Sequence, residues 1–140
     1  MKLRLAHSAA LLLLACTSAF AQNLTASDGD TVTLQGTLLR LPVEIVEGET
    51  LSGDTEFVAI ELATPLDFAC PAQADDACEA EQGQERLHLV ISGDANWEAF
   101  EAGLDAPAQV TGQLMHAHTQ YHHTAVLLVV EEIAPLAKVP

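Results

Sequence analysis

The chain has 140 residues, the length of a single domain, and a formal net charge of −15 at pH 7 from 20 acidic and five basic side chains. Binding of phosphates depends on Lys and Arg displacing counterions, so this charge excludes nucleic acid and anionic membrane surfaces as partners. It favours a cationic ligand or a basic protein partner instead.

Residues 1–21 predict a secretory signal peptide. Two basic residues precede a short apolar run, and residues 19–21 (AFA) form an A-x-A cleavage site. We expect cleavage between Ala21 and Gln22, because the run is too short for a transmembrane helix. The mature chain would keep three basic and 20 acidic side chains, a formal charge of 3 − 20 = −17.

A second interpretation of this segment is a lipid anchor. The letters LLAC, ending at Cys16, resemble a bacterial lipobox in which that cysteine would be lipidated. Leu14 fits poorly two residues before the cysteine, so simple secretion is favoured over a lipoprotein. No later apolar run reaches the length of a membrane span, which predicts a soluble, secreted product without a transmembrane segment.

Residues 22–30 form a polar lead-in, and alternating strands follow it. Residues 31–40 place Val32, Leu34 and Leu38 on one face, and Gly36 interrupts them where a sheet can bend. Apolar and polar residues alternate again in three further stretches, and a fourth stretch is almost continuously apolar. These predicted strands are residues 57–62, 86–91, 108–116 and 124–133, and the segments 41–56 (acidic) and 69–85 (polar) are loops between them.

In residues 94–104 the spacing of the apolar residues changes from the period of two of a strand to the period of about 3.6 of a helix. Trp97, Phe100 and Leu104 recur at i, i+3 and i+7, which predicts a short amphipathic helix with Trp97 and Phe100 in the core. Asp94 is the candidate N-cap, and Gly103 supplies a stop signal.

The order β-β-β-α-β-β predicts a mainly β fold over residues 31–134, with a loose tail at 135–140. Five curved strands with one helix between strands 3 and 4 are typical of a small OB-fold-like barrel. Gly36 and Gly112 would let the first and fourth strands bend to close it. An open α+β sandwich of the same elements is the alternative.

Two cysteines remain in the mature chain, Cys70 and Cys78. Export would place them in an oxidising compartment, so we predict a disulfide between them. Closing so short a loop is worth about 2.5 kcal/mol by the chain-entropy relation. The C-x₂-C spacing of a metal site is absent.

Four histidines crowd into eight positions, at His116, His118, His122 and His123. His116 and His118 would share one face of a strand, and a turn would bring only one of the other two across to them. Three imidazoles with water, or with an acid such as Glu44, would suit Zn²⁺, Cu²⁺ or Ni²⁺.

Two other roles for this cluster stay open. The imidazoles would tie down the hairpin by hydrogen bonds to its backbone and hydroxyl groups, or they would sense pH, because clustered histidines titrate near neutrality. His88 stands alone on its strand and is expected to be a structural residue. No nucleophile elbow, P-loop or H-E-x-x-H motif is present, so an enzyme is not predicted.

Residues 110–130 (VTGQLMHAHTQYHHTAVLLVV) resemble the signature of a bacterial domain of unknown function, number 4431, which reads G-x-L-x-H-A-x-T-x-x-H-H-T-x-V-L-L. The resemblance implies a bacterial exported protein and hence the periplasm. It implies no activity, cofactor or partner. The sequence therefore predicts a periplasmic binding or accessory module whose binding face is the lip formed by residues 41–56 and 116–124. The alternatives are a metalloprotein using the clustered histidines and an envelope structural or stress factor without a small ligand.

Overall fold

The computed structural model describes residues 21–45, 48, 53–74 and 78–136. The predicted signal peptide with Cys16, part of the acidic loop and most of the predicted tail therefore lie outside the described residues. Within the described part of the chain, no helix is long and apolar enough to cross a membrane.

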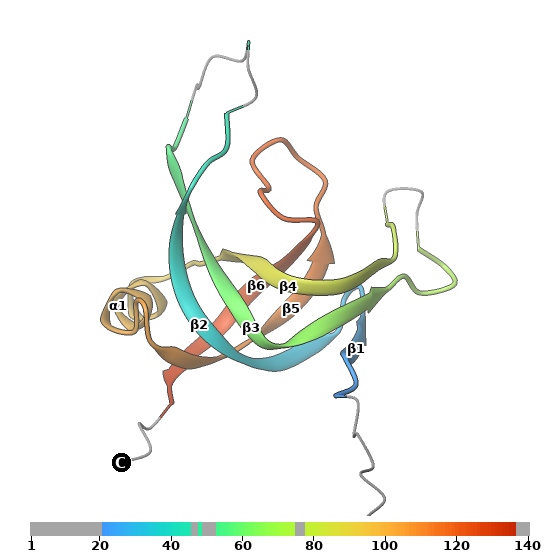
Figure 1. Cartoon of the computed structure of the whole chain (residues 1–140), viewed down its shortest axis with the longest axis horizontal. Helices are drawn as coiled ribbons and strands as arrows, with labels where there is room; N and C mark the ends of the chain where they lie inside the picture. Colours follow the sequence, from blue (N-terminus) through green and yellow to red (C-terminus); the bar gives the residue numbers. More distant parts are fainter. Residues whose placement is uncertain (1–20, 46–47, 49–52, 75–77, 137–140) are drawn as a thin grey trace, which may run out of the picture.

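One mixed sheet and one helix make up the fold (Figure 1). The sheet order is β1-β3-β2-β5-β6-β4, and β3 also pairs with β4, so that the hydrogen-bonded pairs from β2 to β6 form a closed ring. The β1–β3 and β4–β6 pairs are parallel and the others antiparallel. The elements are β1 (Leu24–Ser27), β2 (Thr31–Pro42), β3 (Glu56–Ala69), β4 (Glu81–Val90), α1 (Asp94–Ala102), β5 (Pro107–His116) and β6 (Val126–Pro135).

Strand β2 belongs to two pairings, and it changes partner at Gly36. Residues 31–37 pair with β5 and residues 36–42 pair with β3. A Cβ atom added to Gly36 would collide with the backbone carbonyl of Glu61 on β3. Gly112 of β5 stands at a register shift, where an added Cβ would collide with the backbone of β6. Both glycines therefore permit close backbone approach where the sheet curls, in agreement with the bends predicted from sequence.

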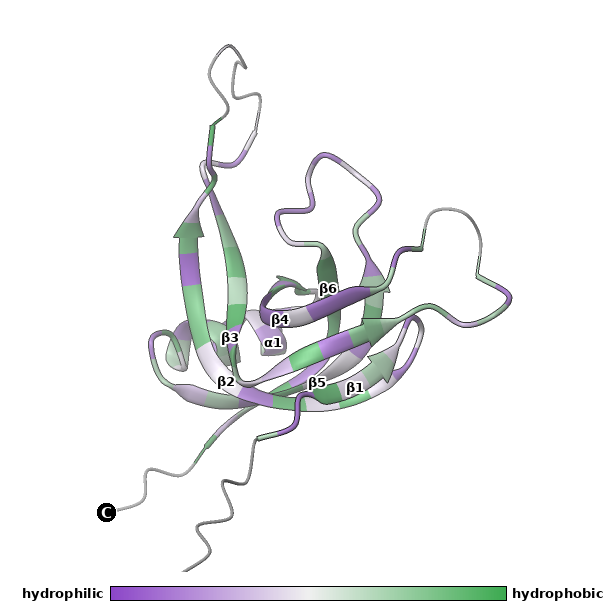
Figure 2. Cartoon of the chain, turned by 45° about the vertical axis from the view of Figure 1, so that its right-hand side comes forward, coloured by the Kyte–Doolittle hydropathy of each residue, from purple (hydrophilic) through white to green (hydrophobic). Residues whose placement is uncertain are grey.

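The core fills the inside of this ring, and it comes from the predicted apolar faces. Hydrophobic residues are concentrated in the strands, which also carry hydrophilic residues, above all in β4 (Figure 2). The most buried large side chains come from α1 and from all strands except β1. They are Leu38, Ile60, Leu66, Leu87, Leu89, Phe100, Val110, Leu114, Val126, Leu127 and Leu128.

Six strands are present rather than the five predicted, because the polar lead-in contains β1. Its residues pair in parallel with Leu66–Ala69 at the end of β3. The turn that follows is closed by the Asp30 carboxylate, which accepts the Ser27 N–H at 2.8 Å, and Gly29 there has φ 85°. This edge strand has only four residues, of which two are exposed and two half-buried, and that is too short a stretch for sequence periodicity to reveal.

Helix α1 covers one side of the ring, with two differences from the prediction. Gly93 occupies the N-cap position and Asp94 is the first helical residue, so the predicted Asp94 cap is wrong by one position. Phe100 is fully buried, whereas Trp97 is 39% exposed and meets Phe100 edge to face at 6.0 Å between ring centroids. The predicted core position of Trp97 is therefore wrong.

Cys70 and Cys78 form a disulfide, as predicted, with 5.9 Å between their Cα atoms. Cys70 directly follows β3, and Cys78 lies three residues before β4 begins. The bond thus ties the end of one strand to the start of the strand that pairs with it. This link fixes the base of the polar loop that connects them.

Candidate functional site

The predicted histidine cluster lies at the connection between β5 and β6, residues 116–125, which we call the histidine hairpin. It projects from the same side of the ring as residues 43–45 and 53–55, which flank the part of the β2–β3 connection that the structure does not describe (Figures 1 and 2). Strand β5 ends at His116, so His118 is no longer on a strand and the expected alternation does not apply to it. The structure divides the four histidines into two groups.

His122 closes the turn of the histidine hairpin. Its Nδ1 accepts the backbone N–H groups of His118 at 3.1 Å and Thr119 at 3.3 Å. An imidazole nitrogen that accepts is unprotonated, so the neutral His122 ring carries its hydrogen on Nε2. In this arrangement the lone pair is used by the backbone, which favours a role in tying down the turn.

His88 of β4 anchors the other end of the histidine hairpin. Its Nδ1 accepts the His123 backbone N–H at 3.3 Å, and the backbone N–H of His88 donates to Thr124 Oγ1 at 2.8 Å. The His123 ring stacks on His88 at 5.4 Å and meets Phe57 of β3 at 4.8 Å between centroids. Sequence reasoning set His88 aside as isolated, because nothing local shows that β4 pairs with β6 thirty-nine residues later, His88 with Leu127.

The electrostatics of this group follow from its packing. Burial, and then the neighbouring His123 and His122, lower the pKa of His88 from 6.5 to about 4. Burial, and then His118 and His123, also lower the pKa of His122. Both shifts favour neutral rings, which are the forms that accept the backbone hydrogen bonds.

Stability is expected to fall in acid because of His88. Its folded pKa is depressed, so the unfolded chain binds more protons. The contribution of neutral His88 to the free energy of unfolding is complete above pH 6.5 and is lost as pH falls through that value toward about 4. The loss should be on the order of 1–3 kcal/mol. Urea unfolding across this pH range measures it.

Many carboxylates also titrate in this pH range, so a pair of variants is needed to identify the contribution of His88. His88→Gln should reduce the change in the free energy of unfolding between pH 6.5 and 4. His118→Gln, at an exposed position of the hairpin, should leave that change as in the wild-type protein. Equal slopes in the wild-type protein and in His88→Gln would contradict the assignment.

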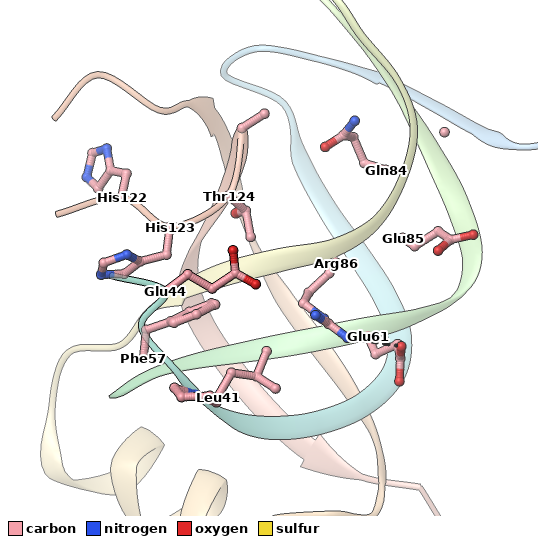
Figure 3. Close-up of a pocket in the computed structure, with 13 residues that line it drawn as sticks. Leu41, Glu44, Phe57, Glu61, Gln84, Glu85, Arg86, His122, His123 and Thr124 are labelled. Atoms are coloured by element: carbon pink, nitrogen blue, oxygen red, sulfur yellow. Dashed lines mark hydrogen bonds and ion pairs between the residues drawn. The ribbon is translucent and has the colours of Figure 1, made fainter. Parts of the chain in front are cut away.

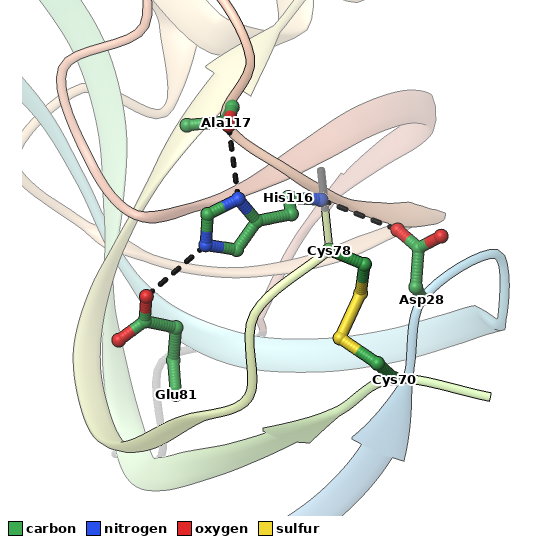
Figure 4. Close-up of a disulfide and its surroundings, with 6 residues drawn as sticks. All are labelled: Asp28, Cys70, Cys78, Glu81, His116 and Ala117. Carbon is green, nitrogen blue, oxygen red and sulfur yellow. Dashed lines mark hydrogen bonds and ion pairs between the residues drawn. A yellow bond between two sulfur atoms is a disulfide. The ribbon is translucent and has the colours of Figure 1, made fainter. Parts of the chain in front are cut away.

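His116 makes a separate set of contacts, shown in Figure 4. Its Nδ1 lies 2.9 Å from the Ala117 carbonyl oxygen, and its Nε2 lies 3.1 Å from Glu81 Oε1. Its backbone N–H donates to Asp28 at 3.2 Å. Glu79 completes a group of three donor side chains whose ligand atoms lie within 4.8 Å of one another.

The predicted combination of His116, His118 and one of His122 and His123 is thus not what the structure brings together. Within the described residues, the group that meets the spacing of a metal site contains His116 but none of the other three histidines. Metal binding by His118, His122 and His123 stays a prediction.

An open cleft of about 810 Å³ lies beside the histidine hairpin (Figure 3). The acidic loop contributes Glu44, and the hairpin contributes His122 and His123. Both segments of the predicted lip therefore line one cleft. Phe57 stands in its wall, where it contacts His123.

The charge of this cleft is mainly negative. Its lining includes the carboxylates of Glu44, Glu61 and Glu85 and the guanidinium of Arg86. Arg86 lies 3.4 Å from Glu61, and both side chains are about half exposed. Three carboxylates beside one guanidinium give a field that attracts cations. The β4 residues 83–86 supply part of this lining, and their role was not predicted from sequence.

Comparison with known proteins confirms the resemblance drawn from the hairpin motif. No curated protein sequence and no solved structure matches the chain. The family model described as "Domain of unknown function (DUF4431)" matches residues 86–134, which run from β4 through α1 and β5 into β6. The match contains all five histidines discussed above and ends before Pro135. The chain therefore carries a DUF4431 domain at residues 86–134.

Proposed function

We propose that this chain is an exported, periplasmic binding module that holds a cationic ligand in the cleft beside the histidine hairpin. The observation that carries the proposal is the cleft itself, which both halves of the predicted lip line and which has mainly acidic walls. Binding rather than catalysis is proposed because the hairpin imidazoles are engaged by backbone N–H groups and stacked rings. Export rests on the signal-peptide pattern of residues 1–21.

The proposal includes an OB-fold-like barrel. The pairing ring β2-β3-β4-β6-β5 and the helix between β4 and β5 support it, because these five strands correspond in order to those predicted from sequence. In OB-folds the loops after the first and fourth strands bind ligands. Here those loops follow β2 and β5, and they are the two that border the cleft.

The ligand class follows from the lining. Carboxylates would pair with amine or guanidinium groups, and the face of Phe57 can contact a cation or an apolar stem. The cleft is open to solvent and its walls are mainly acidic, so a flexible cation or a basic peptide segment fits it better than a compact neutral molecule. Spermidine is a suitable probe because it carries several charges on a flexible apolar chain.

Calorimetric titration of the mature protein, residues 22–140, with spermidine tests this proposal. We expect saturable binding that weakens more than about 5-fold, a loss of about 1 kcal/mol, in Glu44→Gln. Glu98→Gln removes the same charge from exposed α1, outside the cleft, and should change affinity less than about 2-fold.

Two results would count against the cleft. Equal losses in Glu44→Gln and Glu98→Gln would mean that spermidine responds only to net charge. Failure of spermidine to bind at physiological ionic strength would remove the proposed cationic ligand class.

A further inference from the structure

We infer that Glu79, Glu81 and His116 form a binding site for one divalent transition-metal ion, best matched by Zn²⁺. The site lies at the start of β4 and the end of β5, beside the disulfide, and none of its three residues lines the cleft (Figure 4). It does not depend on the proposed binding of cations in the cleft.

The spacing of the donor atoms fits a single ion. The ligand atoms of all three residues lie within 4.8 Å of one another, and His116 Nε2 is 3.1 Å from Glu81 Oε1. Two donors at about 2.1 Å from one tetrahedral ion are about 3.4 Å apart. The separation in the His116–Glu81 pair is within a few tenths of an ångström of that between neighbouring ligands. Glu79 is exposed, so its carboxylate can move to complete the set.

The hydrogen bonding of His116 points its available nitrogen into this group. A carbonyl oxygen can only accept, so the 2.9 Å contact with Ala117 requires a hydrogen on Nδ1. The neutral ring then directs the Nε2 lone pair at a carboxylate oxygen, and two acceptors at 3.1 Å repel unless a cation or a proton lies between them. Metal-bound histidines commonly donate their other ring N–H to a backbone carbonyl in this way.

His122 and His88 offer the opposite arrangement. Their Nδ1 atoms accept backbone N–H groups, so their lone pairs are already used. This difference distinguishes His116 from the two histidines that hold the hairpin in place.

The surroundings hold His116 and the backbone at Glu79 in place before an ion binds. Glu79 directly follows Cys78, whose disulfide to Cys70 fixes the chain at the end of β3. The His116 backbone is held by Asp28, and its side chain is only 15% exposed. One imidazole with two carboxylates suits a borderline transition ion, while Mg²⁺ and Ca²⁺ prefer sets made of oxygen alone.

Titration of the metal-free, oxidised mature protein with Zn²⁺ tests the inference. We expect one ion per chain, with affinity reduced more than about 10-fold in Glu81→Gln and in His116→Gln. Circular dichroism checks that each variant is folded. Glu85→Gln removes the same charge from the same strand, and His118→Gln removes a neighbouring imidazole, so both should stay within about 3-fold of wild type.

Three outcomes would overturn the site. Zn²⁺ binding without a fixed stoichiometry, or equal displacement by Mg²⁺, would indicate general attraction to the acidic surface. A loss of affinity in His118→Gln but not in Glu81→Gln would place the ion at His118. Absence of binding would show that a proton alone joins His116 and Glu81. Spermidine binding in the cleft is unaffected by each of these results, so the two proposals fail separately.

Discussion

Replacing Gly36 by alanine is expected to cause a large loss in the free energy of unfolding. The added methyl group would collide with the Glu61 backbone carbonyl, and a carbonyl in a sheet cannot rotate away as a flexible side chain can. Strand β2 changes partner at this residue, so the strain would act on its pairings with both β3 and β5. Overpacking commonly costs about 1–3 kcal/mol, and backbone collision at the bend should place Gly36→Ala above about 3 kcal/mol. Urea unfolding followed by circular dichroism measures the change.

Gly83→Ala is the matched control for this prediction. An added Cβ there meets nothing within 4 Å, although φ is 62°. The cost should be limited to the strain of a left-handed alanine, about 1–2 kcal/mol. A Gly36→Ala protein that is as stable as Gly83→Ala would contradict the bend described for β2.

The second large effect is expected at Phe100 on helix α1. Phe100 is fully buried beneath Arg40, whose guanidinium lies 5.7 Å from the ring centroid. Phe100→Ala removes a core side chain and leaves a cavity, which should cost about 3–5 kcal/mol in the free energy of unfolding. Chemical denaturation monitored by circular dichroism suits this test, because it does not depend on tryptophan fluorescence.

Trp97→Ala on the same helix is the control for Phe100→Ala. Trp97 is the larger residue but is 39% exposed, and it touches Phe100 only edge to face. Its replacement should lower the free energy of unfolding by less than about 2 kcal/mol, because it removes only the buried part of the side chain and one aromatic contact. A greater loss in Trp97→Ala than in Phe100→Ala would mean that the helix packs through its other face.

Much of the fold could be predicted from the sequence because it is written in local patterns. Alternation identified the buried faces of β2, β3 and β4, and the bend glycines stood out as interruptions of alternating segments. Strand β1 could not be predicted, since its four residues are too few to show a pattern and gain their structure from pairing with β3 about forty residues away. The exposure of Trp97 was missed because helical spacing fixes the face of a residue but not where that face ends.

The site was only partly predictable, and for a physical reason. The motif located the histidine hairpin, but the partners of its histidines lie far away along the chain. His116 meets Glu81 and His123 stacks on His88, both thirty-five residues distant. These contacts depend on the parallel pairing of β4 with β6 and on the position of the disulfide-linked loop. Neither has a local signature in the sequence.

The clustered histidines therefore have two separate structural roles. His122 and His123, together with His88, hold the histidine hairpin against β4 and shape the wall of the cleft. His116 faces the other way, toward two carboxylates. A hairpin held rigidly in this manner would present the cleft without a large ordering cost when a ligand binds.

Residue-resolved NMR titration of the mature protein with spermidine tests the central proposal most directly. The amide signals of Phe57, Arg86 and His123 should shift together and saturably, because these residues line or contact the cleft. Signals around Glu98 and Glu131, which carry the same charge on other surfaces, should stay in place. Shifts of equal size around all acidic residues, or no shifts at the cleft, would contradict the proposed binding site.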